Sequence, residues 1–352
     1  MQTALTPEDT LRINVLLAGS VEAIRIDESA MTLAALTDRG EARIALHPNC
    51  RSDQYLLRVR ETLGGLALGS PGGYPVYLQR WTRMGQTSDR NLAALLLLGE
   101  PEAVVAVAHA PGLTDELARR VWWALPTMDI ARCMLGREEV QGGAMAKVLA
   151  DFLIEHLPFE QNPDAALETV RLVLRAGLAD EPARAALWSM ATRKPHYYLG
   201  FLESFPDHLP QTQPARSDLD AARDALLPLA GHPCAKRLLW ALGAEGQTYL
   251  MALEEVLRRP LTHHIVYTAL DLAGARLREL AQGEAATEAI AAAPHFAAEL
   301  RALAVLAGLS EATAVPVLTR TTAVGPLMRR KLEPLLGPVL GEIAVLRGSA
   351  GG

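Results

Sequence analysis

The stretch Gly112-Leu-Thr-Asp-Glu-Leu-Ala-Arg119, followed by Trp123, recurs as Gly177-Leu-Ala-Asp-Glu-Pro-Ala-Arg184, followed by Trp188. In both copies a Gly-Leu pair precedes two acidic residues, which are favourable in the first turn of a helix because they face the positive end of its dipole. We therefore expect a helical hairpin whose second helix begins at the acidic pair. The tryptophan of each copy is predicted to pack against the next hairpin.

A second shared feature stands upstream of each copy, where Pro101–Ala103 and Pro163–Ala165 both read Pro-acid-Ala, a typical helix opening. Fainter echoes occur at Ala235-Lys236 with Trp240 and at Gly308–Glu311. The spacing suggests an irregular HEAT-like helical repeat or bundle. Chance similarity between unrelated helices is the alternative interpretation.

The composition agrees with a predominantly all-α fold. Half of the 352 residues are hydrophobic but only 5% are aromatic, so alanine, leucine and valine dominate the apolar content. The formal net charge of -6 argues against a chain whose whole surface binds nucleic acid, although it leaves room for a local basic patch.

The N-terminal part has a different character from the rest. We expect a helix over residues 8–18 with Thr6 as its N-cap, and a second helix over Asp53–Leu63. Between them lie three strand-length runs separated by turn residues, which predict a small antiparallel β meander. These runs are Ala23–Ile26, Met31–Leu36 and Ala42–Leu46.

The domain organisation follows from these changes of pattern. The Pro-rich segment 206–217 lacks apolar periodicity and is a possible hinge. The predicted division is an N-terminal α+β module (1–87), a first half of the helical repeat (88–205), the hinge, a second half (218–346) and a disordered tail (347–352).

We recognise no secretory signal and no membrane span in the sequence, and we therefore expect a cytoplasmic protein. Residues 1–12 contain Glu8 and Asp9 where a secretory signal would be basic and then apolar. The most apolar window, Leu92–Ala110, is interrupted by Glu100-Pro-Glu102, so we expect two short buried helices and no membrane partner.

The cysteines and histidines do not form a recognisable site. Cys50, Cys133 and Cys234 are far apart, which is neither a disulfide framework nor a zinc-finger pattern and fits a reducing compartment. We expect Cys133 to be a buried structural thiol. His47-Pro48 and His232-Pro233 are predicted at turns or helix starts, and we expect no metal, no cofactor and no catalytic residue; the motifs G-x-S-x-G, H-E-x-x-H and G-x-G-x-x-G are absent from the sequence.

The strongest candidate interaction surface follows Gly69-Ser-Pro-Gly-Gly73, a loop that lacks the Lys-Ser/Thr of a phosphate-binding loop. Aromatic rings and guanidinium groups then alternate, a combination typical of binding hot spots and of nucleic-acid contacts. The residues of this predicted surface are Tyr74, Tyr77, Arg80, Trp81 and Arg83, with Trp122 added because two adjacent indoles, Trp122 and Trp123, cannot share one helix face. The alternative is that Tyr77 and Trp81 belong to the core that joins the N-terminal module to the helices.

The segments Leu68–Gly85, Leu97–Val107 and His109–Arg120 resemble the DsrS family of sulfur-oxidation proteins, and the similarity extends from Thr6 to Tyr198. This family accompanies the reverse-acting dissimilatory sulfite reductase of sulfur-oxidising bacteria. The resemblance implies a cytoplasmic accessory role, but it implies no reaction and transfers no catalytic residue.

Three functional hypotheses follow. The first is a non-enzymatic accessory protein that contacts protein components of the sulfur-oxidation machinery. The second is a post-transcriptional regulator that binds RNA through the arginine and aromatic residues of the N-terminal module. Arg51, Arg58 and Arg60 of the module, and Arg90 shortly after it, add positive charge. The third is a persulfide-handling enzyme that uses one of the three cysteines.

Overall fold

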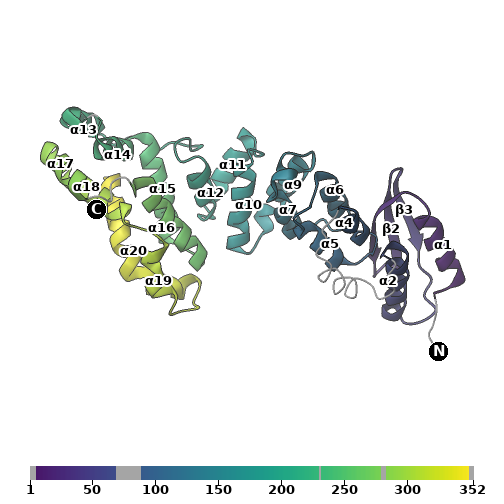
Figure 1. Ribbon diagram of the computed structural model, residues 1–352. Coiled ribbons are helices and arrows are strands. Elements are labelled where there is room, and N and C mark those ends of the chain that lie inside the picture. Colours follow the sequence, from purple (N-terminus) through teal and green to yellow (C-terminus); the bar gives the residue numbers. More distant parts are fainter. Residues whose placement is uncertain (1–4, 69–88, 230, 279–282, 349–352) are drawn as a thin grey trace. The chain divides into compact units, whose positions relative to one another are not determined.

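The computed structural model describes residues 5–68, 89–229, 231–278 and 283–348. The fold is predominantly helical with a small antiparallel sheet near the N-terminus, which confirms the predicted fold class (Figure 1). Contacts group the chain into two units, Met1–His156 and Leu157–Gly352. This division falls at a different place from the predicted boundaries at residue 88 and at 206–217.

The first unit contains three strands and the N-terminal helices. The predicted helix over residues 8–18 is α1, where Thr6 Oγ1 accepts a hydrogen bond from the Asp9 backbone as expected of an N-cap. The predicted Leu92–Ala110 pair of short helices is observed as α4 and α5. The elements of this unit are α1 (Pro7–Leu17), β1 (Val21–Asp27), β2 (Thr32–Thr37), β3 (Gly40–Ala45), α2 (Ser52–Leu68), α4 (Asp89–Leu95), α5 (Pro101–His109), α6 (Asp115–Ala124), α7 (Met128–Leu135), α8 (Glu138–Gln141) and α9 (Met145–His156).

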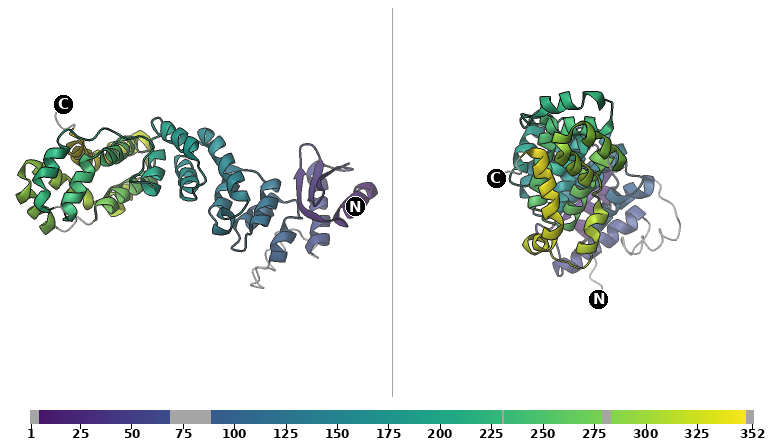
Figure 2. Two further views of the ribbon diagram at one scale, coloured as in Figure 1. Left: turned by 90° about the horizontal axis from the view of Figure 1, so that it is seen from above. Right: turned by 90° about the vertical axis from the view of Figure 1, so that its left-hand side faces the viewer.

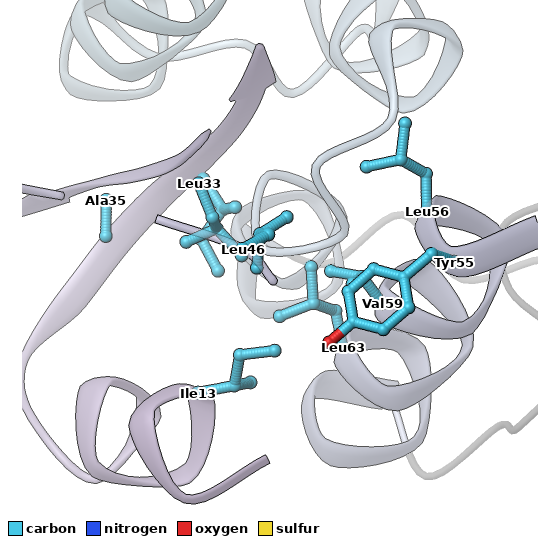
Figure 3. Close-up of a cluster of buried hydrophobic side chains, with 9 residues drawn as sticks. Ile13, Leu33, Ala35, Leu46, Tyr55, Leu56, Val59 and Leu63 are labelled. Carbon is cyan, nitrogen blue, oxygen red and sulfur yellow. The ribbon is translucent and has the colours of Figure 1, made fainter. Parts of the chain in front are cut away.

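The sheet has the order β1-β2-β3, and its register puts alternate residues on opposite faces. One face carries Ile24, Leu33 and Ala35, which pack with Ile13 of α1 and with apolar residues of α2 into a buried cluster (Figure 3). The α2 contribution to this cluster comes from Tyr55, Leu56, Val59 and Leu63. The hydrophobic alternation of the strands therefore fixes which face of the sheet meets α1 and α2.

The opposite face of the sheet meets α6, so the meander is packed onto the helices of its own unit (Figures 1 and 2). Arg119 of α6 bridges Glu22 of β1 and Glu116 of its own first turn, at 2.5 and 2.7 Å. The hydrogen bonds from Arg119 and Arg120 lower the pKa of Glu116 to about 2. The Ile24 backbone N–H also donates to the Leu96 carbonyl at 2.8 Å, which ties the edge of β1 to the end of α4.

The two repeated stretches form the predicted helix starts, but they pack differently. In the first unit α6 begins at Asp115 with Thr114 as N-cap and packs against α5. In the second unit α11 begins at Glu181 with Asp180 as N-cap, and Trp188 packs on Tyr198 and Phe201 of the following helix, as predicted. Trp123 instead faces the sheet, so the predicted role of the tryptophan holds for the second copy alone.

The second unit is helical throughout its described part. Its C-terminal helix α20 packs against α15 and α18 (Figure 1). The helices of this unit, besides short 3-10 turns that include Leu157–Phe159, are α10 (Pro163–Arg175), α11 (Glu181–Ala191), α12 (Tyr197–Ser204), α13 (Leu219–Ala225), α14 (Pro233–Leu242), α15 (Ala244–Arg258), α16 (His263–Leu277), α17 (Gly283–Ala292), α18 (Ala297–Ala307), α19 (Glu311–Leu318) and α20 (Gly325–Arg347).

The predicted hinge segment 206–217 lies inside the second unit and contains no helix. Its backbone is tied to neighbouring helices, because Gln213 N–H donates to Thr248 Oγ1 at 2.7 Å and Arg216 N–H donates to the Leu242 carbonyl at 2.9 Å. The Arg216 side chain also pairs with Glu299 and donates to the carbonyl of Val345 near the end of α20. These bonds tie the segment to α14, α15, α18 and α20, and motion there stays a prediction. Of the predicted tail, residues 349–352 lie outside the described residues.

Within the described ranges, no single helix is long and apolar enough to cross a membrane. The bent pair Pro294–Ala307 and Glu311–Leu318, with an angle of 67° between its helices, meets the criteria of length and composition alone.

Candidate functional site

Of the predicted interaction surface, Trp122 alone lies within the described residues. Tyr74, Tyr77, Arg80, Trp81 and Arg83, together with the loop at residues 69–75, lie outside the described residues. Trp122 is described, and its half-buried ring packs edge-on against Phe152 of α9 with 4.7 Å between centroids. Phe152 in turn stacks on His156 at 4.0 Å. Trp122 therefore contributes to the packing of α6 on α9, and it stays partly accessible.

Trp123 makes the more distinctive contacts of the tryptophan pair. The Arg25 guanidinium of β1 lies 4.6 Å from the centre of the Trp123 ring, and it donates to the Trp123 carbonyl at 3.2 Å. The indole N–H donates to Glu41 of β3 at 3.0 Å. The Glu41 carboxylate also accepts hydrogen bonds from Arg43 and Arg25. The hydrogen bond from Arg43 is the largest cause of the pKa of Glu41 being lower than its ordinary value. Trp123 thus joins both outer strands of the sheet to α6.

Beside this contact lies a cleft of about 640 Å³, which we call the Arg25 cleft. It is formed by the β1–β2 hairpin, the start of α5 and the end of α6. Its lining combines charges of both signs with apolar side chains, a mixture suited to a polypeptide partner. The lining residues are Ile24, Arg25, Ile26, Asp27, Glu28, Ser29, Ala30, Thr32, Ala34, Arg43, Gly99, Glu100, Pro101, Val104, Ala124 and Leu125.

Two local features shape the cleft. The Asp27 carboxylate accepts hydrogen bonds from the backbone of Ser29 and Ala30 at 3.0 and 2.9 Å, which holds the hairpin turn and helps to lower the pKa of Asp27. Gly99 adopts φ +65°, and a Cβ atom there would lie 2.9 Å from Cδ1 of Ile26. The positive φ and the close approach to Ile26 therefore favour glycine at position 99, between β1 and the start of α5. The sequence pattern does not predict this cleft, because the cleft depends on how the β1–β2 hairpin packs against α5 and α6.

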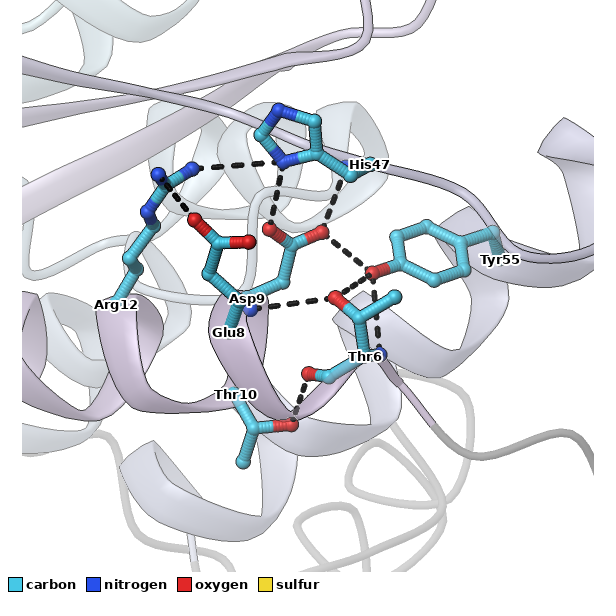
Figure 4. A network of polar contacts seen from close by, with 7 residues as sticks. All are labelled: Thr6, Glu8, Asp9, Thr10, Arg12, His47 and Tyr55. Atoms are coloured by element: carbon cyan, nitrogen blue, oxygen red, sulfur yellow. Dashed lines mark hydrogen bonds and ion pairs between the residues drawn. The ribbon is translucent and has the colours of Figure 1, made fainter.

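A second polar cluster lies on the far side of the sheet, around the buried carboxylate of Asp9 (Figure 4). Asp9 accepts from the Tyr55 hydroxyl at 2.5 Å and from the His47 backbone N–H at 2.7 Å, and its other oxygen lies 3.1 Å from His47 Nδ1. Burial alone would raise the pKa of Asp9, but these hydrogen bonds outweigh it and hold the pKa below its ordinary value. The cluster fastens α1 to the segment between β3 and α2.

Of the two histidines that precede proline, His232 lies at a helix start, as predicted, whereas His47 lies in the connection between β3 and α2. His232 is the N-cap of α14 and its Nδ1 accepts from the Cys234 backbone at 3.2 Å. His47 belongs to the Asp9 cluster, and His263 contacts the Ala323 carbonyl at 2.8 Å. Among the residues with defined positions, no three His, Cys, Asp or Glu side chains gather in a way that could hold a metal ion.

The three cysteines are separate thiols. Cys133 is half-buried, not fully buried as predicted; its Sγ donates to the Ala108 carbonyl at 3.3 Å and lies 3.3 Å from His109 Nδ1. Burial raises the pKa of Cys133 and of Cys234. A raised pKa leaves less of the nucleophilic thiolate at neutral pH. The raised pKa values therefore do not favour either thiol as a nucleophile in persulfide chemistry.

Most arginines of the N-terminal module form ion pairs. Three arginines expected to add positive charge for RNA binding, Arg51, Arg58 and Arg60, pair with Asp53, Glu61 and Glu28. Arg12, Arg25 and Arg43 pair with Glu8 and Glu41. These pairs reduce the local positive potential that attracts a phosphate backbone.

Comparisons with protein-family models, with curated proteins and with solved structures found no match to this chain.

Proposed function

We propose that this chain is a non-catalytic accessory protein that acts through protein–protein contacts. The resemblance to the DsrS family supports placing it in cytoplasmic sulfur oxidation, with protein components of that machinery as partners. The observation that best supports a binding role is the Arg25 cleft, with its volume of about 640 Å³. The β1–β2 hairpin, α5 and α6 build this cleft, although they are distant in the sequence. Ion pairs with Glu41 hold the side chains of Arg25 and Arg43 in position.

The character of the cleft favours a polypeptide as the partner. Arg25 and Arg43 of the lining both pair with Glu41 beside the cleft, while Asp27, Glu28 and Glu100 add negative charge to the lining. A surface with both signs of charge beside apolar side chains complements a protein segment better than a uniformly anionic phosphate backbone. The ion pairs of the arginines in the N-terminal module also favour a polypeptide partner over RNA.

RNA binding remains the alternative, through Arg80 and Arg83 and the aromatic residues around them. It predicts retention that falls steeply as salt increases, because each neutralised phosphate releases counterions. The double substitution R80A/R83A should then abolish RNA retention while the chain stays folded.

The test is a pull-down with the tagged full chain from an extract of sulfur-oxidising cells, with and without ribonuclease. In parallel, Ala30→Trp places a bulky ring at an exposed position of the cleft lining. Ala221→Trp is the matched control, since Ala221 is an exposed alanine of α13 in the other unit. We expect ribonuclease-resistant recovery of sulfur-oxidation proteins with the wild type and with A221W, and its loss with A30W.

Two outcomes would contradict this proposal. Equal recovery with A30W and A221W would remove the Arg25 cleft from the interaction. Retention of transcripts without any stable protein partner, abolished by R80A/R83A, would favour the RNA-binding regulator.

A further inference from the structure

A pocket in the second unit lies where the 3-10 turn Leu157–Phe159 and the start of α10 meet the connection between α11 and α12. Its volume is about 540 Å³, which is within the range of small-molecule sites. The residues that line it are Pro158, Phe159, Glu160, Gln161, Pro163, Lys194, His196 and Leu261. Neither the Arg25 cleft nor the proposed protein contacts involve this pocket.

His196 is the unusual residue of this lining. Its side chain is buried, with 5% exposed, yet neither ring nitrogen has a hydrogen-bond partner among the described residues. The ring packs edge-on against Tyr197 with 4.9 Å between centroids. A buried polar group without a partner destabilises a fold, so such groups usually have a ligand, a water molecule or a functional role.

Lys194 supplies a positive charge at the same wall. Its ammonium donates to the carbonyl oxygens of Pro158 and Glu160 at 3.0 and 3.5 Å. It forms no ion pair with a carboxylate in the described parts of the chain. Because its partners are neutral carbonyl groups, the charge is held in position but is not neutralised, and an ammonium group has three N–H donors.

Two carboxylates lie close to the pocket, and each accepts a hydrogen bond. Glu160 accepts from the Asn162 backbone N–H at 2.9 Å, and Asp164 accepts a hydrogen bond from Thr262. Burial, followed by the charge of Lys194, lowers the pKa of His196 to about 4, so the imidazole is neutral at pH 7. A neutral imidazole offers one donor and one acceptor, which leaves Lys194 as the group that can balance a ligand's charge.

We propose that this pocket binds a small organic molecule with an oxyanion group, carboxylate or phosphate, which pairs with Lys194 while His196 hydrogen-bonds to a polar atom of the same ligand. This ligand site is independent of the proposed protein contacts. Charge-assisted pairing explains why an uncompensated ammonium is retained at the wall, and the second contact explains the partnerless imidazole.

The test uses the full chain with three probes: succinate, its neutral analogue succinamide, and inorganic phosphate. Titration calorimetry measures affinity, and histidine-selective ¹⁵N NMR follows the His196 ring, whose signal is assigned by its loss in His196→Phe. We expect succinate or phosphate to bind and to shift that signal, and succinamide to do neither. Binding of succinate alone assigns a carboxylate ligand, and binding of phosphate alone assigns a phosphate ester.

Three variants separate the contributions. Lys194→Gln and His196→Phe should each weaken oxyanion binding by about tenfold, as expected for loss of a hydrogen bond that involves a charged group. Arg193→Gln is the matched control, because Arg193 is an exposed neighbouring cation that does not line this pocket; its affinity should stay within about twofold of the wild type. Absence of binding by both anions, or equal affinities in K194Q and R193Q, would overturn the proposal.

Discussion

The hydroxyl of Tyr55 in α2 donates a hydrogen bond of 2.5 Å to the carboxylate of Asp9 in the first turn of α1. Both residues are buried, with 1% of each exposed. Because the same carboxylate accepts from His47, one acidic side chain joins α1, α2 and the connection that follows β3. The N-terminal helix is therefore held by a polar contact as well as by the apolar packing of Ile13.

Replacement of Tyr55 by phenylalanine should loosen this contact. The variant keeps the ring but removes a hydrogen bond to a charged, buried group, and we expect a loss of about 2 kcal/mol in the free energy of unfolding of the first unit. Faster hydrogen exchange in α1 and α2 would report the change. Tyr267→Phe is the control, since its hydroxyl makes no hydrogen bond to another described residue, and an equal effect of both variants would contradict the prediction.

Two glycines in helices of the second unit should respond to alanine in opposite directions. At Gly274 in α16 a Cβ atom would lie 1.8 Å from the Leu309 carbonyl oxygen, whereas at Gly341 in α20 it would meet nothing within 4 Å. We expect Gly274→Ala to lower the free energy of unfolding by about 3 kcal/mol through overpacking. Gly341→Ala should raise it by about 0.5–1 kcal/mol, since alanine favours helix over glycine. Urea denaturation measures both, and a tolerated G274A would show that the close approach of α16 to Leu309 is wrong.

The two repeat tryptophans should differ in their contribution to stability. Trp188 is buried against Tyr198 and Phe201, so Trp188→Ala should destabilise the second unit by about 4 kcal/mol. Trp123 is half-buried and contacts Arg25 and Glu41, so Trp123→Ala should destabilise the first unit by about 1–2 kcal/mol. Hydrogen exchange resolved along the chain would locate each effect, and equal losses would argue that the two copies pack alike.

The stability of the second unit should depend on pH through His196. Its pKa is about 4 in the folded chain and about 6.5 in an unfolded one, so between these values the unfolded state binds more protons. Stability is therefore complete above pH 6.5 and falls as the pH decreases toward 4. Between pH 7 and pH 5 the loss should be about 2 kcal/mol.

The matched variant for this pH dependence is His196→Phe. Carboxylates titrate in both proteins, so the difference between wild type and H196F in urea denaturation at pH 7 and pH 5 isolates the histidine. The variant should lose less stability on acidification. At pH 7 it should be at least as stable as the wild type, because it removes two buried nitrogens without partners. A parallel decrease in both proteins would show that His196 does not titrate in this range.

Helix starts were the features most directly predictable from the sequence. Thr6-Pro7, Pro101 and Pro163 predicted the first residues of α1, α5 and α10, because capping and proline geometry act within one turn of the chain. The three strands were equally local, since alternation of apolar residues between turn residues marked them before any partner was known.

The candidate sites were not predictable in the same way. The Arg25 cleft combines β1, β2, α5 and α6. The pocket that contains Lys194 and His196 combines the 3-10 turn Leu157–Phe159, the start of α10, the connection between α11 and α12, and Leu261. No short stretch of sequence contains either. The surface proposed from Tyr74 to Arg83 lies outside the described residues, so its role stays a prediction.

The sequence by itself determined the local conformation of this protein: where helices begin, where three strands alternate, and which faces of them are apolar. Packing decided what the charged and polar residues do. Arginines that look free in the sequence are paired, Asp9 is buried beneath a tyrosine, and His196 is left without a partner. The physical reason is that capping and periodicity act over a few residues, whereas burial and electrostatic pairing depend on residues that only the folded chain brings together.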